Sequence, residues 1–388
     1  MFKRLISTLL ICAICVFSPL GILSVSAAPS EQEVALSPSD LSAQSAILTD
    51  GDGLPLFEKN ANERMGPAST TKLMTALVVS ETLPLGMEVK IPAAAVGIEG
   101  SSVYLHEGEI LTVEHLLYAL LLSSANDAAT ALAIASSGSV EAFCEKMNEK
   151  ATALGLTDTH FSNPHGLADD NHYTTAHDLA IIASEVLRTP SLRPIVATYK
   201  TTIPLCGTEG TRVLVNHNKM LKLYDGAIGC KTGFTKKTGR TLVSAAERDG
   251  LLLIAVTLDA PDDWNDHSKL LDYGFSCYVR VNLFNEGESI ATLPVCGGEA
   301  DYVALVPTDD ICLTLPKRGK GLSYAIESTG HFLYAPVKEG DHVARAICSI
   351  GEQSVSVELV AAFDVSRRKK DAPSPLYRIL HFFNIDEE

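Results

Sequence analysis

The chain has 388 residues, of which 46% are hydrophobic and 6% aromatic, and its formal net charge is −16. This length is enough for one large domain and a smaller one. The acidic balance argues against a nucleic-acid partner, because binding to phosphates requires a basic face. The same balance still permits an anionic substrate that binds in one local basic pocket.

The N-terminus has the pattern of a secretory signal peptide over residues 1–27. Lys3 and Arg4 provide the basic start, residues 5–25 are apolar, and small residues just before Ala28 form a cleavage site. We therefore expect an exported protein whose first mature residue is Ala28. An uncleaved membrane anchor is the alternative.

Nine cysteines occur in the chain, and loss of Cys12 and Cys15 with the signal peptide leaves seven. An odd number at irregular spacing is not a disulfide framework. No Cys-x-x-Cys pair survives cleavage, so the sequence predicts no zinc or other metal site and no cofactor. We expect these cysteines to be small buried hydrophobic residues, with one or two bridges in the C-terminal part as the open alternative.

Apolar periodicity organises the chain after a polar, flexible lead-in at residues 28–43. Short apolar runs on either side of Asp-Gly-Asp-Gly at 50–53 predict a β-hairpin. The elements that follow predict a large domain of the α/β (α+β) class over residues 44–275. We expect helices at 69–82, 112–122, 127–135, 143–154, 176–187 and 265–273, and strands at 229–232, 241–246 and 251–258.

The pattern changes after residue 275. Short apolar stretches alternate with Gly and Pro turns, which predicts a small all-β domain, a β-sandwich, over residues 276–366. Residues 367–388 begin with four basic residues and continue with apolar residues at i, i+3, i+4 and i+7, namely Leu376, Ile379, Leu380 and Phe383. This pattern predicts a basic linker and an amphipathic helix at a membrane surface, with docking on the β domain as the alternative.

Three short strings carry the chemistry. They are Ser-Thr-Thr-Lys at 69–72, Ser-Ala-Asn at 124–126 and Lys-Thr-Gly at 231–233. On a helix, Ser69 and Lys72 lie one turn apart on one face, so the lysine can act as base for the serine. Burial and a nearby second cation, Lys231, would keep Lys72 partly neutral. Together the strings predict a serine acyl-transfer site that handles a peptide carboxylate.

The second and third strings supply the remaining groups. Ser124 and Asn126 are expected between two helices, where a hydroxyl can relay a proton and a carboxamide can bind peptide groups. If the third string lies on an edge strand, Gly233 lets the substrate backbone come close. The N–H groups of Phe234 and Ser69 would then form an oxyanion hole.

The flanks of these strings resemble the serine D-alanyl-D-alanine carboxypeptidases, the low-molecular-mass penicillin-binding proteins. The resemblance runs through most of residues 45–275. Its motifs are PASTTKLMT at 67–75, LLSSANDAA at 121–129, NPHGL at 163–167, TTAHDLA at 174–180, NHNK at 216–219, DGAIGCKTGFT at 225–235 and LLDYGF at 270–275.

The resemblance implies a penicillin-recognising transpeptidase-like domain, with an antiparallel sheet between helical groups, followed by a β domain and a membrane-anchor helix. It implies that Ser69 is acylated with Lys72 as base and that Ser124 relays protons. Asn126 would bind the substrate amide, while Lys231 and Thr232 would hold the terminal D-alanine carboxylate. The implied reaction removes that D-alanine from a peptidoglycan pentapeptide stem outside the cytoplasmic membrane, and β-lactams would acylate the same serine.

One position departs from the family. An arginine usually precedes the Leu-Leu-Asp-Tyr-Gly helix and helps to hold the substrate carboxylate, whereas Asp263 stands there in this chain. An acid would repel the carboxylate. Three explanations are open: Lys231 and Thr232 suffice, a neighbouring cation such as Arg240 replaces the arginine, or turnover is low.

Three other functions compete with the carboxypeptidase. A class A β-lactamase needs a glutamate loop that activates the deacylating water, and we find no counterpart between the second and third strings. A D,D-endopeptidase uses the same three strings. A catalytically weak wall-binding protein would retain the fold, and the Asp263 departure is its sole support.

Overall fold

The computed structural model describes residues 21–23, 35–205, 209–318, 322–328, 330–350 and 353–369. The chain forms two compact units. The N-terminal unit is Ser30–Arg280, and the C-terminal unit begins at Val281 and includes a short strand from residues 21–23. Each unit is described by itself.

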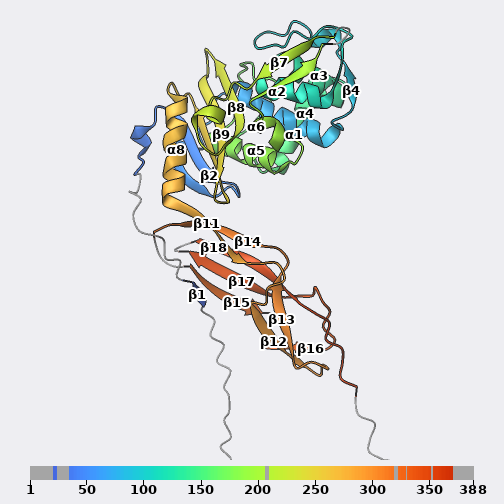
Figure 1. The fold of residues 1–388 in the computed structure, drawn as a ribbon, viewed down its shortest axis with the longest axis vertical. Helices are drawn as coiled ribbons and strands as arrows, with labels where there is room; N and C mark the ends of the chain where they lie inside the picture. Colours follow the sequence, from blue (N-terminus) through green and yellow to red (C-terminus); the bar gives the residue numbers. More distant parts are fainter. Residues whose placement is uncertain are drawn as a thin grey trace, which may run out of the picture. The chain divides into compact units, whose positions relative to one another are not determined.

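A five-stranded antiparallel sheet forms the centre of the N-terminal unit (Figure 1). The hairpin predicted around residues 50–53 is confirmed, because its two strands pair in antiparallel register. The other three strands also pair antiparallel, and the last one, β8, is an edge strand. In sheet order the strands are β3 (Pro55–Lys59), β2 (Ser45–Asp50), β10 (Leu251–Leu258), β9 (Gly239–Arg248) and β8 (Ala227–Thr235).

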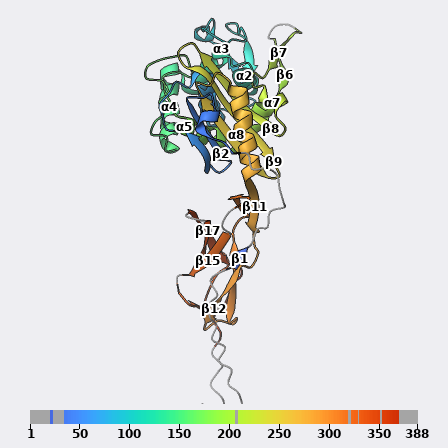
Figure 2. The ribbon, with the colours of Figure 1, turned by 90° about the vertical axis from the view of Figure 1, so that its left-hand side faces the viewer.

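Helices cover both faces of this sheet. Strand side chains alternate between faces, so Ile254 and Val256 enter one core while Leu253 and Ala255 enter the other. Helix α8 (Asp263–Cys277) packs on the face of Leu253, as Figure 2 shows, and a group of helices packs on the opposite face. Burial of each such aliphatic side chain contributes about 1.5–3 kcal/mol. Both faces are apolar, which explains the nearly continuous hydrophobic runs of these strands.

The helical group consists of α1 (Lys72–Thr82), α2 (Val113–Leu122), α3 (Asn126–Ser137), α4 (Val140–Ala153) and α5 (Ala176–Arg188). These helices were predicted, but several boundaries differ, since α4 begins at Val140 rather than at 143 and α3 ends at Ser137 rather than at 135. Two further differences concern the candidate site. Ser69 lies in a 3₁₀ turn, η2 (Ala68–Thr71), ahead of α1 rather than inside it. Asn126 is the first residue of α3 rather than part of the connection before it.

Several short elements were missed by the sequence analysis. They have between three and five residues each, which is too short for a periodic pattern to identify them. They are η1 (Pro38–Asp40), β4 (Glu88–Lys90), η3 (Ala93–Ala95), β5 (Ile110–Thr112), α6 (Arg193–Ala197), β6 (Lys200–Pro204), β7 (Thr211–Val215) and α7 (Met220–Leu223).

The described residues of the C-terminal unit contain strands and no helix, so the predicted all-β architecture is confirmed. Strand β11 (Tyr278–Phe284) pairs with β14 (Ile311–Pro316). A second sheet has the order β1 (Gly21–Leu23), β15 (Leu322–Ser328), β17 (His342–Ile350), β18 (Gln353–Ala361), β13 (Tyr302–Pro307), β12 (Ala291–Cys296) and β16 (Leu333–Tyr334).

Both predicted terminal segments lie largely outside the described residues. Of the predicted signal peptide the structure describes residues 21–23 alone, which form β1. The predicted amphipathic helix within 367–388 falls beyond the last described residue, 369. Within the described part of the chain, every helix is too short or too polar to cross a membrane.

Candidate active site

The 3₁₀ turn η2 presents Ser69 in an unusual backbone setting. Ala68, directly before it, has a φ of 48°, a left-handed conformation that costs free energy for a residue other than glycine. Gly166 packs on this turn with a φ of 89°, and a Cβ there would lie 1.8 Å from the Ala68 carbonyl oxygen. No side chain fits at residue 166, so the loop that contains it lies directly against the turn.

Lys72 is fully buried and connects the first two strings. Its Nζ lies 3.0 Å from Ser69 Oγ, 2.7 Å from Asn126 Oδ1 and 2.6 Å from the His165 carbonyl oxygen. Asn126 Oδ1 and the His165 carbonyl can only accept hydrogen bonds, whereas a hydroxyl can donate or accept. A neutral amine therefore gives its two N–H groups to those acceptors and directs its lone pair at Ser69.

The electrostatics favour the neutral amine. Burial lowers the pKa of Lys72 well below its usual range, the charge of Lys231 lowers it further, and Asp127 opposes the shift. Burial also lowers the pKa of Lys231 to about 7. The sequence analysis named burial and Lys231 as the two causes for Lys72, and desolvation is the larger effect because no solvent reaches the amine.

The second string lies where α2 gives way to α3. Ser124 is buried and has a φ of 59°, so both Ser69 and Ser124 lie at or beside left-handed backbone. The carboxamide of Asn126 is engaged at both ends, because its Nδ2 donates to the Glu99 carbonyl at 2.5 Å while Oδ1 accepts from Lys72. A carboxamide has two N–H groups and an oxygen with two lone pairs, so these two contacts do not use its full hydrogen-bonding capacity.

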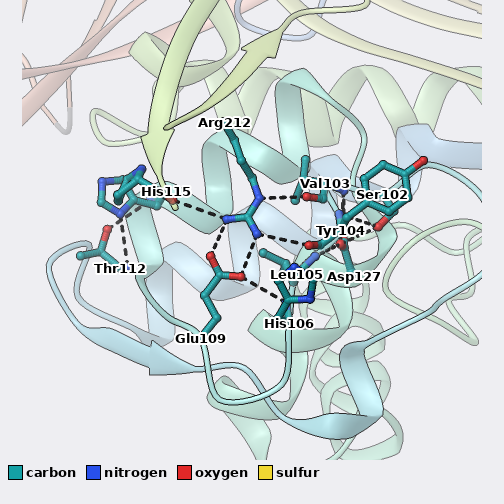
Figure 3. A network of polar contacts seen from close by, with 11 residues as sticks. Ser102, Val103, Tyr104, Leu105, His106, Glu109, Thr112, His115, Asp127 and Arg212 are labelled. Carbon is teal, nitrogen blue, oxygen red and sulfur yellow. Dashed lines mark hydrogen bonds and ion pairs between the residues drawn. The ribbon is translucent and has the colours of Figure 1, made fainter. Parts of the chain in front are cut away.

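The loop that contacts Asn126 is held from two sides (Figure 3). Buried Asp127 accepts hydrogen bonds from Ser102 Oγ at 2.6 Å and from the Leu105 N–H at 3.0 Å. Arg212 on β7 donates to the Val103 carbonyl at 3.0 Å and forms a buried ion pair with Glu109. The hairpin of β6 and β7 thus fixes the segment that positions Asn126. The sequence analysis did not single out Glu99, Glu109 or Arg212.

The third string lies on the edge strand β8. Lys231 and Gly233 are buried toward η2, while Thr232 and Phe234 lie on the more exposed side. A Cβ at Gly233 would lie 2.8 Å from the Ser69 nitrogen and 2.3 Å from Thr241 Oγ1. The sequence analysis assigned the glycine to close approach of substrate. In the structure, the Ser69 nitrogen and Thr241 Oγ1 also need this space, and the approach of substrate stays a prediction.

A cleft of about 810 Å³ opens beside these groups. Its lining includes Ser69, Thr232, Gly233, Phe234, Arg240 and Asp263. Asp263 is not a lone acid there, because its Oδ2 lies 2.9 Å from Arg240 Nη2. Burial raises the pKa of Asp263, and the hydrogen bond from Arg240 opposes that shift. The guanidinium, whose side chain is 41% exposed, therefore supplies a cation to the cleft from β9.

Two histidines near the nucleophile are neutral. Burial and the charge of Lys72 lower the pKa of His165 to about 3, and burial lowers that of His172 to about 4. His172 Nδ1 accepts from the Ser162 N–H, which assigns the ring proton to Nε2, 2.8 Å from Thr71 Oγ1. Neither ring competes with Lys72 as a charged group. The described residues contain no cluster of His, Cys, Asp or Glu that would hold a metal ion.

Comparison with known proteins defines the class. The family model for D-alanyl-D-alanine carboxypeptidases matches residues 32–262. The model for the C-terminal domain of penicillin-binding protein 5 matches residues 278–367. The chain therefore belongs to the D-alanyl-D-alanine carboxypeptidase family, among the low-molecular-mass penicillin-binding proteins.

Individual relatives support the same family assignment. D-alanyl-D-alanine carboxypeptidase DacF of Bacillus subtilis is 34% identical over 93% of this chain and 94% of its own length. DacA of Escherichia coli is 33% identical over 78% of each chain. Among solved structures, penicillin-binding protein 5 from Haemophilus influenzae superposes with a TM-score of 0.74 at 28% identity, covering 86% of this chain and all of that one.

Family membership makes the chain a serine hydrolase with D-alanyl-D-alanine carboxypeptidase activity. Its substrate class is peptidoglycan peptide ending in D-Ala-D-Ala, and β-lactam binding is typical of the family. The predicted fold, a penicillin-recognising domain followed by a β domain, is confirmed by the same comparisons.

Proposed function

We propose that Ser69 is the acylated nucleophile of this carboxypeptidase, with Lys72 as its general base and Ser124 as a proton relay. The observation that carries the proposal is the arrangement around Lys72 Nζ. Two acceptors that cannot donate hold its N–H groups, and Ser69 Oγ lies 3.0 Å away. The depressed pKa of Lys72 keeps the lone pair available for a proton.

The reaction then has two halves. In the first, Lys72 accepts the hydroxyl proton as Ser69 Oγ bonds to the carbonyl carbon of the penultimate D-alanine. The N–H groups of Ser69 and Phe234 stabilise the oxyanion. The C–N bond breaks, Ser124 passes a proton to the leaving amine and receives the proton held by Lys72, and D-alanine departs, which leaves Lys72 neutral again. In the second half, water loses a proton to Lys72 and attacks the ester, and Lys72 returns that proton to Ser69 Oγ as the shortened peptide is released.

The terminal carboxylate would bind beside Lys231 and Thr232, with the Arg240–Asp263 pair as part of the same subsite. Arg240 lies opposite Phe234 in the sheet register, and Thr232 lies two residues away on the same side of β8. A guanidinium binds a carboxylate well, and the buried carboxylate of Asp263 fixes its position. Of the three explanations for the Asp263 departure, this pairing supports replacement by Arg240.

The nucleophile and the reaction are tested together. The protein should release D-alanine from a synthetic pentapeptide and be labelled by a fluorescent penicillin. Ser69→Ala should lose both, whereas Ser356→Ala, an exposed serine of the C-terminal unit, should keep both. Equal labelling of Ser69→Ala would overturn the assignment. Cleavage of a cross-linked peptide dimer in preference to the pentapeptide would identify an endopeptidase.

The carboxylate subsite has its own test, which uses a peptide whose terminal carboxylate is replaced by an amide. Wild type should prefer the acid over the amide. Arg240→Gln should lose about 10–100-fold in kcat/KM for the acid and little for the amide, because it removes one charge-assisted contact. Asp263→Asn should show a smaller loss. Equal losses for acid and amide would rule Arg240 out as a carboxylate ligand.

We also propose that the protein is exported, is cleaved after residue 27 and is held at the outer face of the cytoplasmic membrane by residues 367–388. The signal-peptide pattern supports export, and the basic run followed by an apolar helical stripe supports membrane association. N-terminal sequencing of the mature protein should start at Ala28. Deletion of residues 370–388 should move it from the membrane fraction to the soluble one, and an unchanged distribution would contradict the anchor.

A further inference from the structure

The C-terminal unit exposes three aromatic side chains on or beside the two strands that flank β12. Tyr334 on β16 is 74% exposed, Tyr302 on β13 is 58% exposed and Phe332 just before β16 is 43% exposed. Phe332 and Tyr334 pack edge to face with their ring centroids 5.1 Å apart. We call Tyr302, Phe332 and Tyr334 the aromatic patch. Exposure of large rings in a group is uncommon on a soluble surface and indicates a binding face.

The sheet register places these rings on one face. Tyr302 lies opposite Pro294, and Tyr334 lies opposite Cys296 two residues further along β12. Residues opposite each other in a ladder project to the same side of a sheet. The neighbours Leu293 and Val295 point the other way and are buried. The outer face of β13, β12 and β16 thus presents the patch continuously.

The described chain ends beside this patch. Gly298, in the turn after β12, forms an isolated bridge with Arg367, and the Arg367 guanidinium donates to the carbonyl of Ala335 at 2.9 Å. Ala335 is the residue directly after Tyr334. Strands β12, β13 and β16 lie together at one end of the C-terminal unit (Figure 1), so the described chain ends at the end that carries the patch.

The charges at this end are mixed but include exposed cations. Arg367, Arg368 and Lys369 are exposed, and Arg368 pairs with the exposed carboxylate of Asp301 at 2.8 Å. Lys370 adds a further cation in the sequence. Basic residues next to aromatic side chains match the chemistry of an anionic lipid surface, where rings lie at the headgroup level and cations meet phosphates.

We propose that the aromatic patch is a lipid-contact surface, which rests this end of the C-terminal unit on the anionic membrane from which the terminal segment anchors the chain. The inference rests on the proposed membrane association. Tyrosine suits this position because it has an apolar ring and a hydroxyl that stays in water. With a second contact beside the anchor, the unit has a defined orientation on the bilayer.

Tryptophan scanning tests the proposal on the full mature chain with residues 370–388 intact. The one native tryptophan is removed with Trp264→Phe, and Tyr334→Trp or Tyr302→Trp is added. The matched control is Val355→Trp, an exposed site in β18. From the register of β13 and β18 it lies about 30 Å along the strands from Tyr302. The probe is a vesicle of phosphatidylglycerol and phosphatidylcholine with bromine on the acyl chains.

We expect the vesicles to quench the indole in Tyr334→Trp and Tyr302→Trp and not in Val355→Trp. In the chain that retains Trp264, Tyr302→Ser combined with Tyr334→Ser should lower the vesicle partition coefficient by about tenfold, because two partly buried rings are lost. D-alanine release from a soluble pentapeptide should be unchanged in that double variant, which separates this surface from the hydrolase site.

Four results would overturn the proposal. If wild type sediments with vesicles but no patch position is quenched, membrane association stands and the patch is not a lipid surface. If wild type does not sediment, the membrane association itself fails. If the indole emission of Tyr334→Trp shifts when peptidoglycan glycan is added without vesicles, the patch binds the glycan. If the emission without vesicles instead changes on deletion of residues 370–388, the patch binds the chain's own end.

Discussion

The two units of this protein differ most in what they bury. The N-terminal unit buries Lys72, Lys231, Asp127 and Asp263 together with many uncharged polar side chains, whereas Thr314 is the only buried polar side chain among the described residues of the C-terminal unit. The described non-glycine residues with left-handed backbone also lie in the N-terminal unit. A buried charge costs free energy unless it is paired or neutralised.

The N-terminal unit therefore carries the free-energy cost of buried ionisable groups, and these groups lie at the candidate active site. Burial is what suits Lys72 to its proposed role as base, because the same desolvation that destabilises the ammonium lowers its pKa. The C-terminal unit has a conventional apolar core and places its unusual feature, the aromatic patch, on the surface. One unit therefore has its unusual groups in its interior and the other has them on its exterior.

Removal of the buried base should have the largest effect. Lys72→Met should lower both penicillin acylation and D-alanine release by about 10²–10⁴-fold, because general-base catalysis is lost. Its thermal stability should stay close to that of wild type, because relief of the desolvated amine offsets the loss of the donor to Asn126 Oδ1 and to the His165 carbonyl. Lys338→Met, at an exposed lysine of the C-terminal unit, should change neither quantity. A marked fall in stability would contradict the stated cost of burying Lys72.

The next largest effect concerns ion pairs. Arg212→Met removes the cation that pairs with buried Glu109 and should lower the free energy of unfolding by about 3–5 kcal/mol, measured by urea titration. The exposed pair of Arg345 and Glu327 in the C-terminal unit is the control, and Arg345→Met should cost at most about 1 kcal/mol. Acylation by penicillin should also slow in Arg212→Met, because its loop positions Asn126. Similar stability losses for both variants would contradict the expected difference between the buried ion pair of one unit and the exposed ion pair of the other.

Backbone contact should give a kinetic effect of moderate size. Gly233→Ala forces β8 away from the Ser69 nitrogen and should lower the acylation rate by about 10²-fold, since small misplacements of reacting groups are costly. Gly330→Ala in the C-terminal unit is the matched control, because its added Cβ meets nothing closer than 3.5 Å. Stopped-flow measurement of the acylation rate compares both variants. An unchanged rate in Gly233→Ala would show that η2 tolerates the displacement.

The smallest effect is a pH dependence of stability. The pKa of Lys231 is about 7 in the folded chain and near 10.5 when unfolded, so the unfolded state binds more protons between these values. The destabilisation is complete below about pH 7 and fades as the pH rises toward 10.5. Stability of wild type relative to Lys231→Met should therefore rise between pH 6.5 and 8.5 in urea titrations. A constant difference would mean that the burial of Lys231 does not shift its pKa.

Much of the fold was predictable from local pattern. Continuous apolar runs identified β9 and β10, and apolar periodicity identified α2, whose N-cap Thr112 accepts from the His115 N–H at 3.2 Å. The 3₁₀ turn around Ser69 was not recognised, because the left-handed conformation of Ala68 is imposed by contacts from Gly166 and β8. Those contacts are distant in sequence and have no local signal.

The candidate site was predictable in its residue types and less so in its connections. The three strings predicted Ser69, Lys72, Asn126 and Lys231 as site residues. The structure brings Lys72 into contact with Ser69 and Asn126. The His165 carbonyl that completes the surroundings of Lys72 is a backbone atom, which residue identity does not reveal. The Asn-Pro-His-Gly sequence at 163–166 was the one local signal that this segment belongs to the site.

The sequence by itself determined the class of chemistry, the order of the two domains and the departure at Asp263, because each depends on residue type and spacing. The tertiary structure decided which groups meet. It paired Asp263 with Arg240, buried Lys72 completely, and brought the aromatic residues of β13 and β16 to one face beside the end of the described chain. The physical reason is that pKa values, ion pairs and surfaces depend on neighbours far away in sequence, which are set by packing.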